Sequence, residues 1–199
     1  MSSEPFPIFV KLLQIIELKN TEKINKYLTK KIHKLYAQDP DYHADFDCDV
    51  FTTYKKENLI NDPVCTEFFT EIADHVSAFA KYFGSNYPIA CEEAWMNLAK
   101  PGGYQETHLH SMSHFSIVYY VSVPEDSGNI VFVNDEIRDM YGIPVNTTPV
   151  PLVTSCRFWV KPIVSNLLIF RSNIEHYVTK NNSKNDRISV SANFSMLYK

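Results

Sequence analysis

The sequence contains no long hydrophobic run, no CxxC pair of cysteines and no excess of basic residues. No apolar segment approaches the roughly 20 residues of a membrane-spanning helix, and the N-terminal segment lacks the features of a signal peptide. We therefore expect a cytoplasmic protein with reduced thiols at its four dispersed cysteines. The net charge of −4 and the pI near 6.0 argue against general nucleic-acid binding, although they leave room for a local basic patch.

The first 88 residues predict a helical support region. Residues 20–37 carry apolar side chains at helical spacing, behind a plausible cap at Asn20 or Thr21. A second helix is predicted over Pro63–Phe83, with Asp62 as its cap. The acidic segment between the two helices lacks the glycine and the closing glutamate of an EF-hand, and we interpret it as a solvated connection.

Residues 89–199 have the pattern of short strands separated by turns. Together with the helices they predict a single domain over residues 1–199, mostly β with flanking α. The expected architecture is a double-stranded β-helix, or jelly-roll, barrel with the N-terminal helices packed on one sheet. The expected strands are Ala90–Leu98, Tyr104–His110, Phe115–Val123, Asn129–Val133, Ser155–Val160, Asn166–Phe170, His176–Lys180 and Arg187–Phe194.

Two of these strands have one apolar face and one face rich in hydroxyl groups. Along residues 115–123, one alternating set is wholly apolar or aromatic, whereas the other contains Ser116, Tyr120 and Ser122. Along residues 187–194, the polar set begins with Arg187 and Ser189 and continues through Ser191 and Asn193. A sheet exposed to solvent gives the same alternation, but a barrel with helices outside it also does, with the polar face lining a cavity.

The histidines of the segment YQETHLH suggest a metal site. His108 and His110 lie two residues apart, so on a strand they project from the same face and can bind one ion if a third ligand is supplied. His176, which follows the apolar strand NLLIF and a turn, is the natural third ligand. A chance HxH without metal is one alternative, and a zinc pair formed by His110 and His114 at helical spacing is another.

Four segments in order, GGYQETHLH, IVYYVSV, NLLIFRSNIEHYV and RISVSANF, resemble the iron(II)/2-oxoglutarate-dependent oxygenases. The resemblance is to the prolyl-hydroxylase-like branch and its relatives in bacteria and phages, and it covers about residues 95–195. It implies that His108 and His176 are iron ligands. It also implies that Arg187 binds the far carboxylate of 2-oxoglutarate, with Ser189 and the phenol of Tyr120 beside it.

At His110 the sequence departs from the family's usual pattern, which has a carboxylate at this position. An imidazole fits there sterically, and three neutral ligands leave iron(II) its full charge before the cosubstrate binds. This difference favours tight 2-oxoglutarate binding, and it disfavours halogenation because His110 fills the place that a halide needs. Glu106 shares the strand face but precedes His108, which is the wrong order for the usual triad.

The resemblance implies an iron(II)- and 2-oxoglutarate-dependent dioxygenase that uses O2 and produces succinate and CO2. We expect a hydroxylase of a peptidyl or small-molecule C–H bond, with no membrane partner. Asn97, Trp95 and Tyr104 are candidates for the pocket wall, although core packing is an alternative role for Trp95. The long loop over residues 134–154 is a candidate for substrate selection.

Two other functions remain compatible with the sequence. The first is a cupin-like metalloprotein with three histidine ligands that does not use 2-oxoglutarate, for which Arg187 would be dispensable. The second is a non-enzymatic barrel, which would show no metal-dependent turnover.

Overall fold

The computed structural model describes residues 10–42, 48–134 and 156–198. Most of its regular structure is β, arranged as one sheet of six strands and one of four, in which all neighbouring strands are antiparallel. The six-stranded sheet has the order β1-β8-β5-β10-β3-β2, and the four-stranded sheet has the order β4-β9-β6-β7. The strands are β1 (Leu13–Glu17), β2 (Phe51–Thr52), β3 (Ile89–Ala99), β4 (Gln105–His108), β5 (Phe115–Ser122), β6 (Ile130–Val133), β7 (Arg157–Val160), β8 (Asn166–Arg171), β9 (His176–Val178) and β10 (Arg187–Met196).

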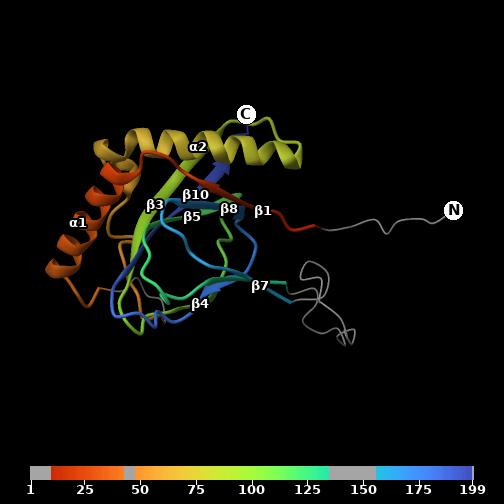
Figure 1. Cartoon of the computed structure of the whole chain (residues 1–199). Coiled ribbons are helices and arrows are strands. Elements are labelled where there is room, and N and C mark those ends of the chain that lie inside the picture. Colours follow the sequence, from red (N-terminus) through yellow and green to blue (C-terminus); the bar gives the residue numbers. More distant parts are fainter. Residues whose placement is uncertain (1–9, 43–47, 135–155, 199) are drawn as a thin grey trace, which may run out of the picture.

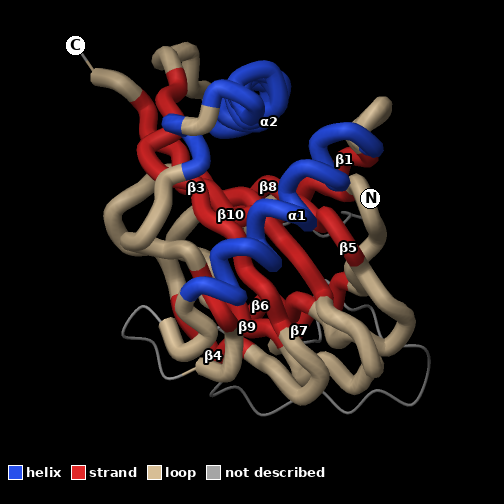
Figure 2. The backbone as a smooth tube through the Cα atoms, turned by 90° about the vertical axis from the view of Figure 1, so that its left-hand side faces the viewer, coloured by secondary structure: helices blue, strands red, loops and turns tan. Residues whose placement is uncertain are grey.

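The helices α1 (Glu22–Gln38) and α2 (Thr66–Ala80) cover the outer face of the six-stranded sheet (Figures 1 and 2). The main apolar core lies between them and this sheet, and it includes Phe79 of α2 and Phe115 of β5. A smaller apolar cluster joins the two sheets, with Tyr120 from the six-stranded sheet and Phe132 from the four-stranded sheet. None of the described helices is long and apolar enough to cross a membrane.

Local sequence signals set the ends of the second helix. The side chain of Asp62 accepts a hydrogen bond from the backbone N–H of Val64 and caps a short 3-10 turn over Pro63–Cys65, from which α2 continues. After α2, a second 3-10 turn ends at Gly84, whose φ of +74° is a left-handed conformation that glycine adopts without strain. The predicted helix over Pro63–Phe83 is therefore present as α2 with a 3-10 turn at each end, η2 (Pro63–Cys65) and η3 (Lys81–Phe83).

The N-terminal region differs from the predicted helical support because it contributes two strands to the six-stranded sheet. β1 pairs with β8, and β2, only two residues long, pairs with β3. The first helix begins one residue after Thr21, whose hydroxyl makes no cap but lies 2.6 Å from the hydroxyl of Ser165. These two strands are formed by pairing with distant segments, which short-range periodicity does not show.

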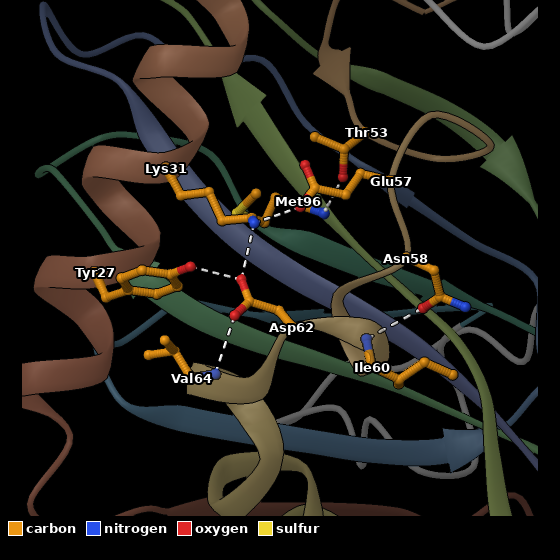
Figure 3. A network of polar contacts seen from close by, with 9 residues as sticks. All are labelled: Tyr27, Lys31, Thr53, Glu57, Asn58, Ile60, Asp62, Val64 and Met96. Carbon is orange, nitrogen blue, oxygen red and sulfur yellow. Dashed lines mark hydrogen bonds and ion pairs between the residues drawn. The ribbon is translucent and has the colours of Figure 1, made fainter.

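A polar network ties α1 to the segment before α2 (Figure 3). The carboxylate of Asp62 accepts hydrogen bonds from the phenol of Tyr27 at 2.6 Å and from the ammonium of Lys31 at 2.8 Å. Lys31 also pairs with Glu57. The Asp62 and Lys31 side chains are only 9% and 19% exposed, so the pair is largely shielded from solvent.

We expect Asp62→Ala to lower the free energy of unfolding by about 2–4 kcal/mol, because it removes the cap and leaves Lys31 and Tyr27 without their shared acceptor. Urea unfolding measures the loss. Asp39→Ala is the control, since Asp39 pairs with Lys56 but its side chain is 49% exposed, and exposed pairs contribute only about 0–1 kcal/mol. Equal losses in the two variants would contradict a structural role for the network.

Candidate metal and cosubstrate site

A cavity of about 230 Å³ lies between the two sheets. Its wall contains the polar set of β10, which is Arg187, Ser189, Ser191 and Asn193. From β5, Val118 and Tyr120 of the second alternating set line it, but so does Ile117 of the first set, and Ser116 and Ser122 are not part of the described wall. Phe115 and Tyr119 of the first set belong to the core beneath the helices. The prediction that a hydroxyl-rich face lines a cavity is therefore confirmed for β10 and met only in part for β5.

The structure brings His108, His110 and His176 together at this cavity. One ring nitrogen of each lies within 4.8 Å of one ring nitrogen of the others. His108 ends β4 and is the register partner of His176, which begins β9, and their ring centroids are 4.3 Å apart. His110 lies beyond the strand, held by a 2.9 Å bond from its backbone N–H to the carbonyl of Ser172, and its ring stacks on that of His176. The expected strand over residues 104–110 is therefore shorter, although the rings still converge.

The hydrogen bonds of two of these rings leave a nitrogen available as a ligand. The Nδ1–H of His108 donates to the carbonyl of Glu106 at 2.8 Å, and the Nδ1–H of His176 donates to the carbonyl of Ile174 at 2.9 Å. In a neutral imidazole this fixes the lone pair on Nε2. Burial lowers the pKa of both rings, which keeps them neutral. Three neutral nitrogen donors suit a divalent transition metal such as iron(II).

We expect the metal-free protein to lose stability when the pH falls from 7 to 5, by at most about 2 kcal/mol from His110 alone. Burial, and then the charge of His108, lowers the pKa of His110 from 6.5 to about 4. Between these values the unfolded chain binds more protons than the folded chain, so acid favours unfolding, whereas the full stability is present above pH 6.5. Urea unfolding in the presence of a chelator at both pH values measures the loss.

His110→Gln is the control for this pH dependence, because it removes the titrating ring. The variant should lose clearly less stability than the wild type over the same interval. A loss as large as that of the wild type would show that His110 titrates normally.

Arg187 is buried in the cavity wall and has no carboxylate partner among the described residues. Its side chain is held by a 2.6 Å hydrogen bond from Nη1 to the carbonyl of Ser127. The neighbouring Gly128 has a φ of +87°, and a Cβ there would lie 2.4 Å from the carbonyl oxygen of Thr179, so only glycine fits. Burial lowers the pKa of Arg187, but a guanidinium keeps its charge in proteins. A buried cation without a counter-ion indicates a site for an anionic ligand.

Ser189 and Tyr120 lie beside Arg187. Ser189 is the register partner of Tyr120 on one side and of Asn97 on the other, and all three line the cavity. Burial raises the pKa of Tyr120, so its phenol is neutral and can donate a hydrogen bond. The described wall therefore offers a guanidinium and hydroxyl donors at one end.

Of the three residues expected in the pocket wall, Trp95 and Asn97 line the cavity and Tyr104 does not. Trp95 lines the cavity and its ring stacks on His110 at 5.7 Å, and Asn97 donates a hydrogen bond to Ser191 at 3.1 Å. Tyr104 is 45% exposed and is not part of the described wall, so the expectation that it lines the pocket is not met.

The alternative ligands do not join the three rings. His114 lies near the C-terminus, where it contacts Tyr198 at 2.8 Å, and no helix joins it to His110. The side chain of Glu106 is outside the histidine group, and no carboxylate belongs to that group among the described residues. The expected substrate-selecting loop over residues 134–154 lies outside the described residues apart from Asn134.

Glu93 and Tyr54 are among the wall residues that were not predicted from the sequence. Glu93 shares the strand parity of Trp95 and Asn97, so the period of two along β3 was a signal for it. Tyr54 follows β2 and packs edge-on against Trp95, at 4.9 Å between centroids. It comes from a segment without strand periodicity, and no local signal points to it.

Comparisons with known proteins agree with this geometry. Residues 93–193 match the family described as "Putative 2OG-Fe(II) oxygenase". No curated protein matches the sequence significantly.

Solved structures of related fold cover nearly the whole chain. A prolyl-4-hydroxylase from Pseudomonas putida superposes with a TM-score of 0.66 at 14% identity, covering 94% of each chain. SnoK, a non-heme α-ketoglutarate-dependent carbocyclase from nogalamycin biosynthesis, gives 0.64 at 12% identity, over 92% of this chain and 79% of SnoK. HygX from Streptomyces hygroscopicus, solved with nickel and 2-oxoglutarate, gives 0.58 at 11% identity, over 95% of this chain and 84% of HygX. At these identities the superpositions establish a shared fold, and the family match spans half of the chain and includes the three histidines and Arg187. The chain therefore belongs to the 2-oxoglutarate- and iron(II)-dependent oxygenases.

Proposed function

We propose that the chain is a hydroxylase within this family, acting on a C–H bond of a peptide or small molecule, and that residues 1–199 form one domain built on a double-stranded β-helix. Iron(II), 2-oxoglutarate and dioxygen are the cofactor and cosubstrates of the family. The observation that carries the proposal is that three histidine nitrogens converge in the same cavity as a buried guanidinium that has no carboxylate partner among the described residues.

His108, His110 and His176 would hold the iron. The carbonyls that accept hydrogen bonds from His108 and His176 orient those rings, and the stack of His110 on Trp95 supports the third. Bound iron(II) supplies the oxidising chemistry, in which dioxygen and 2-oxoglutarate are consumed, succinate and CO2 are formed and a substrate C–H bond is hydroxylated.

Arg187 would bind the carboxylate of 2-oxoglutarate that lies farther from the metal. A guanidinium binds a carboxylate through two parallel hydrogen bonds, and the bond to Ser127 already holds one arm of Arg187 in place. Ser189 and the neutral phenol of Tyr120 would donate further hydrogen bonds to the same carboxylate. Apolar wall residues such as Val118 and Trp95 would limit water around the reacting atoms.

The most specific part of the proposal is that the reaction hydroxylates the substrate C–H bond. The neighbour from P. putida is a prolyl-4-hydroxylase, which favours hydroxylation, whereas SnoK is a carbocyclase of the same cofactor dependence. The cupin-like alternative is disfavoured because it gives no role to a buried arginine in the cavity that holds the three histidines.

Anaerobic reconstitution tests the proposed function. We expect iron(II) and 2-oxoglutarate together to produce a weak visible charge-transfer band that neither produces alone. Admission of oxygen should then bleach the band and release succinate. A metal-loaded protein that shows neither the band nor succinate would leave only a metal-binding protein.

A further inference from the structure

The pairing of β3 with β10 fixes the sequence of residues along one side of the cavity, from one end to the other. Cavity-lining residues of β10 lie beside residues of β3, and Arg187 is at one end, beside Ala99, which is not itself part of the described wall. Glu93 on β3, beside Asn193 on β10, is at the other end, six residues from Ala99, or about 20 Å at the usual rise per residue. The paired residues in order are Arg187 with Ala99, Ser189 with Asn97, Ser191 with Trp95, and Asn193 with Glu93.

Of the three histidines, His110 stacks on Trp95, which is two residues from Glu93 and four from Ala99 and so lies nearer the Glu93 end. If Arg187 binds 2-oxoglutarate as proposed above, the cosubstrate fills one end of the cavity. The substrate must then approach the metal from the side of Glu93.

Glu93 and Arg187 give the two ends opposite charge. Among the described residues that line the cavity, Glu93 is the one carboxylate and Arg187 the one arginine or lysine. The substrate end is therefore electronegative where the cosubstrate end is electropositive.

The carboxylate of Glu93 is held in place but lacks a cation. The side-chain amide of Asn193 donates to Glu93 Oε1 at 2.8 Å, and the hydroxyl of Ser116 donates to Asn193 Oδ1 at 2.9 Å. No ion pair to Glu93 occurs within the described part of the chain. Lys55 and Lys56 line a second hollow together with Glu93, but Lys56 pairs with Asp39 at 2.7 Å and the ammonium of Lys55 lies over the Tyr54 ring.

The negative charge of Glu93 affects the pKa of the neighbouring residue Tyr54. Burial, and then the charge of Glu93, raises the pKa of Tyr54, whose ring packs on Trp95. Leu109 and Met112 also line the cavity, together with Ser111 and Ser113 of the same segment, and are 43% and 89% exposed. A fixed carboxylate bordered by aromatic and aliphatic side chains suits a cation carried on an aliphatic chain.

We propose that Glu93 determines substrate specificity by binding a positively charged nitrogen group, an ammonium or guanidinium, at the end of an aliphatic chain whose carbon is oxidised at the metal. This inference rests on the proposed function and narrows its substrate class. A neutral substrate such as a peptidyl proline would desolvate the carboxylate without supplying a counter-ion, which is unfavourable.

Binding of paired probes tests the assignment of Glu93. Nα-acetyl-lysine methylamide and Nα-acetyl-norleucine methylamide share a four-carbon chain, and only the first carries the ammonium. Ligand-observed NMR would measure their affinities for the zinc-loaded protein with 2-oxoglutarate bound. We expect the wild type to bind the lysine probe about tenfold more tightly or better, and Glu93→Gln to bind both probes within about twofold of each other.

Two further variants complete the experiment. Glu92→Gln removes the same charge one residue away, from an exposed side chain outside the described cavity wall, and should keep the full preference. Glu93→Asp keeps the charge on a shorter side chain and should keep part of the preference, which covers the case in which Glu93→Gln does not fold. A wild-type protein without preference, a preference that survives in Glu93→Gln, or failure of both probes to bind would each overturn the inference. The charge-transfer band of the wild type, measured without any probe, separates this outcome from failure of the proposed function.

Discussion

Replacement of Arg187 by leucine is expected to lower the affinity of the metal-loaded protein for 2-oxoglutarate by about 100-fold or more. Loss of one member of a buried, hydrogen-bonded charge pair costs roughly 2–5 kcal/mol, and Arg187 is the one arginine or lysine among the described residues of the cavity wall. Titration of 2-oxoglutarate into the iron(II) protein without oxygen, followed by the visible band, measures the change. Metal affinity should stay close to that of the wild type.

The same substitution should affect the ligand-free protein in the opposite direction. Arg187 is 5% exposed and has no counter-ion among the described residues, so its burial opposes folding until an anion binds. Arg187→Leu is therefore expected to raise the melting temperature of the metal-free protein while it lowers cosubstrate affinity. Arg187 would then lower the stability of the ligand-free protein while it binds the cosubstrate, a combination that is common at binding sites.

Arg157→Leu is the matched control, since Arg157 is an exposed residue of β7 outside the described cavity wall. It should leave 2-oxoglutarate affinity within about twofold of the wild type. A band titration in Arg187→Leu that matched the wild type would contradict the assigned role. It would favour a three-histidine metalloprotein that does not use 2-oxoglutarate.

The faces of β5 and β10 were predictable because their alternation is regular and both sides are determined by packing. Helices cover one side of these strands and the cavity lies on the other. Alternate residues of β10, and in part of β5, therefore face the cavity. The four-stranded sheet is more fragmented, with β4 and β9 spanning four and three residues. These two strands contain His108 and His176, and the limits expected for them, Tyr104–His110 and His176–Lys180, were too long.

The sequence predicted that the three histidine rings meet, but its argument that His108 and His110 share one strand face holds only for His108. The sequence argument placed His108 and His110 on one strand face, whereas β4 ends at His108 and a register irregularity lies between Gln105 and His108. The position of His110 depends on its backbone bond to Ser172, a contact between distant segments. Glu93 was missed although it shares the strand parity of Trp95 and Asn97, whereas Tyr54 lies in a segment without strand periodicity and had no local signal. The role of the histidines as metal ligands stays a prediction, and their substitution is expected to cause the largest change in metal affinity.

Replacement of His176 by alanine is expected to weaken metal binding by about 1000-fold or more, because substitutions that only orient a ligand already cost about 10–100-fold. The two remaining rings would have to bind the ion with water in place of the third nitrogen. Competition with a coloured chelator would measure iron(II) and zinc affinity, a readout that needs no turnover. The charge-transfer band and succinate release should disappear together with the metal.

His114→Ala separates loss of a ligand from loss of any histidine, because His114 contacts Tyr198 outside the group. It should bind metal like the wild type. His110→Asp makes a finer comparison, since it keeps a ligand but changes the charge of the metal-binding group by −1. That variant should retain the metal and bind the dianionic 2-oxoglutarate more weakly, as expected if three neutral imidazoles leave the ion its full charge. If His176→Ala kept the metal affinity of the wild type, the convergence of the rings would be packing alone, and the ion would have to be sought elsewhere in the cavity.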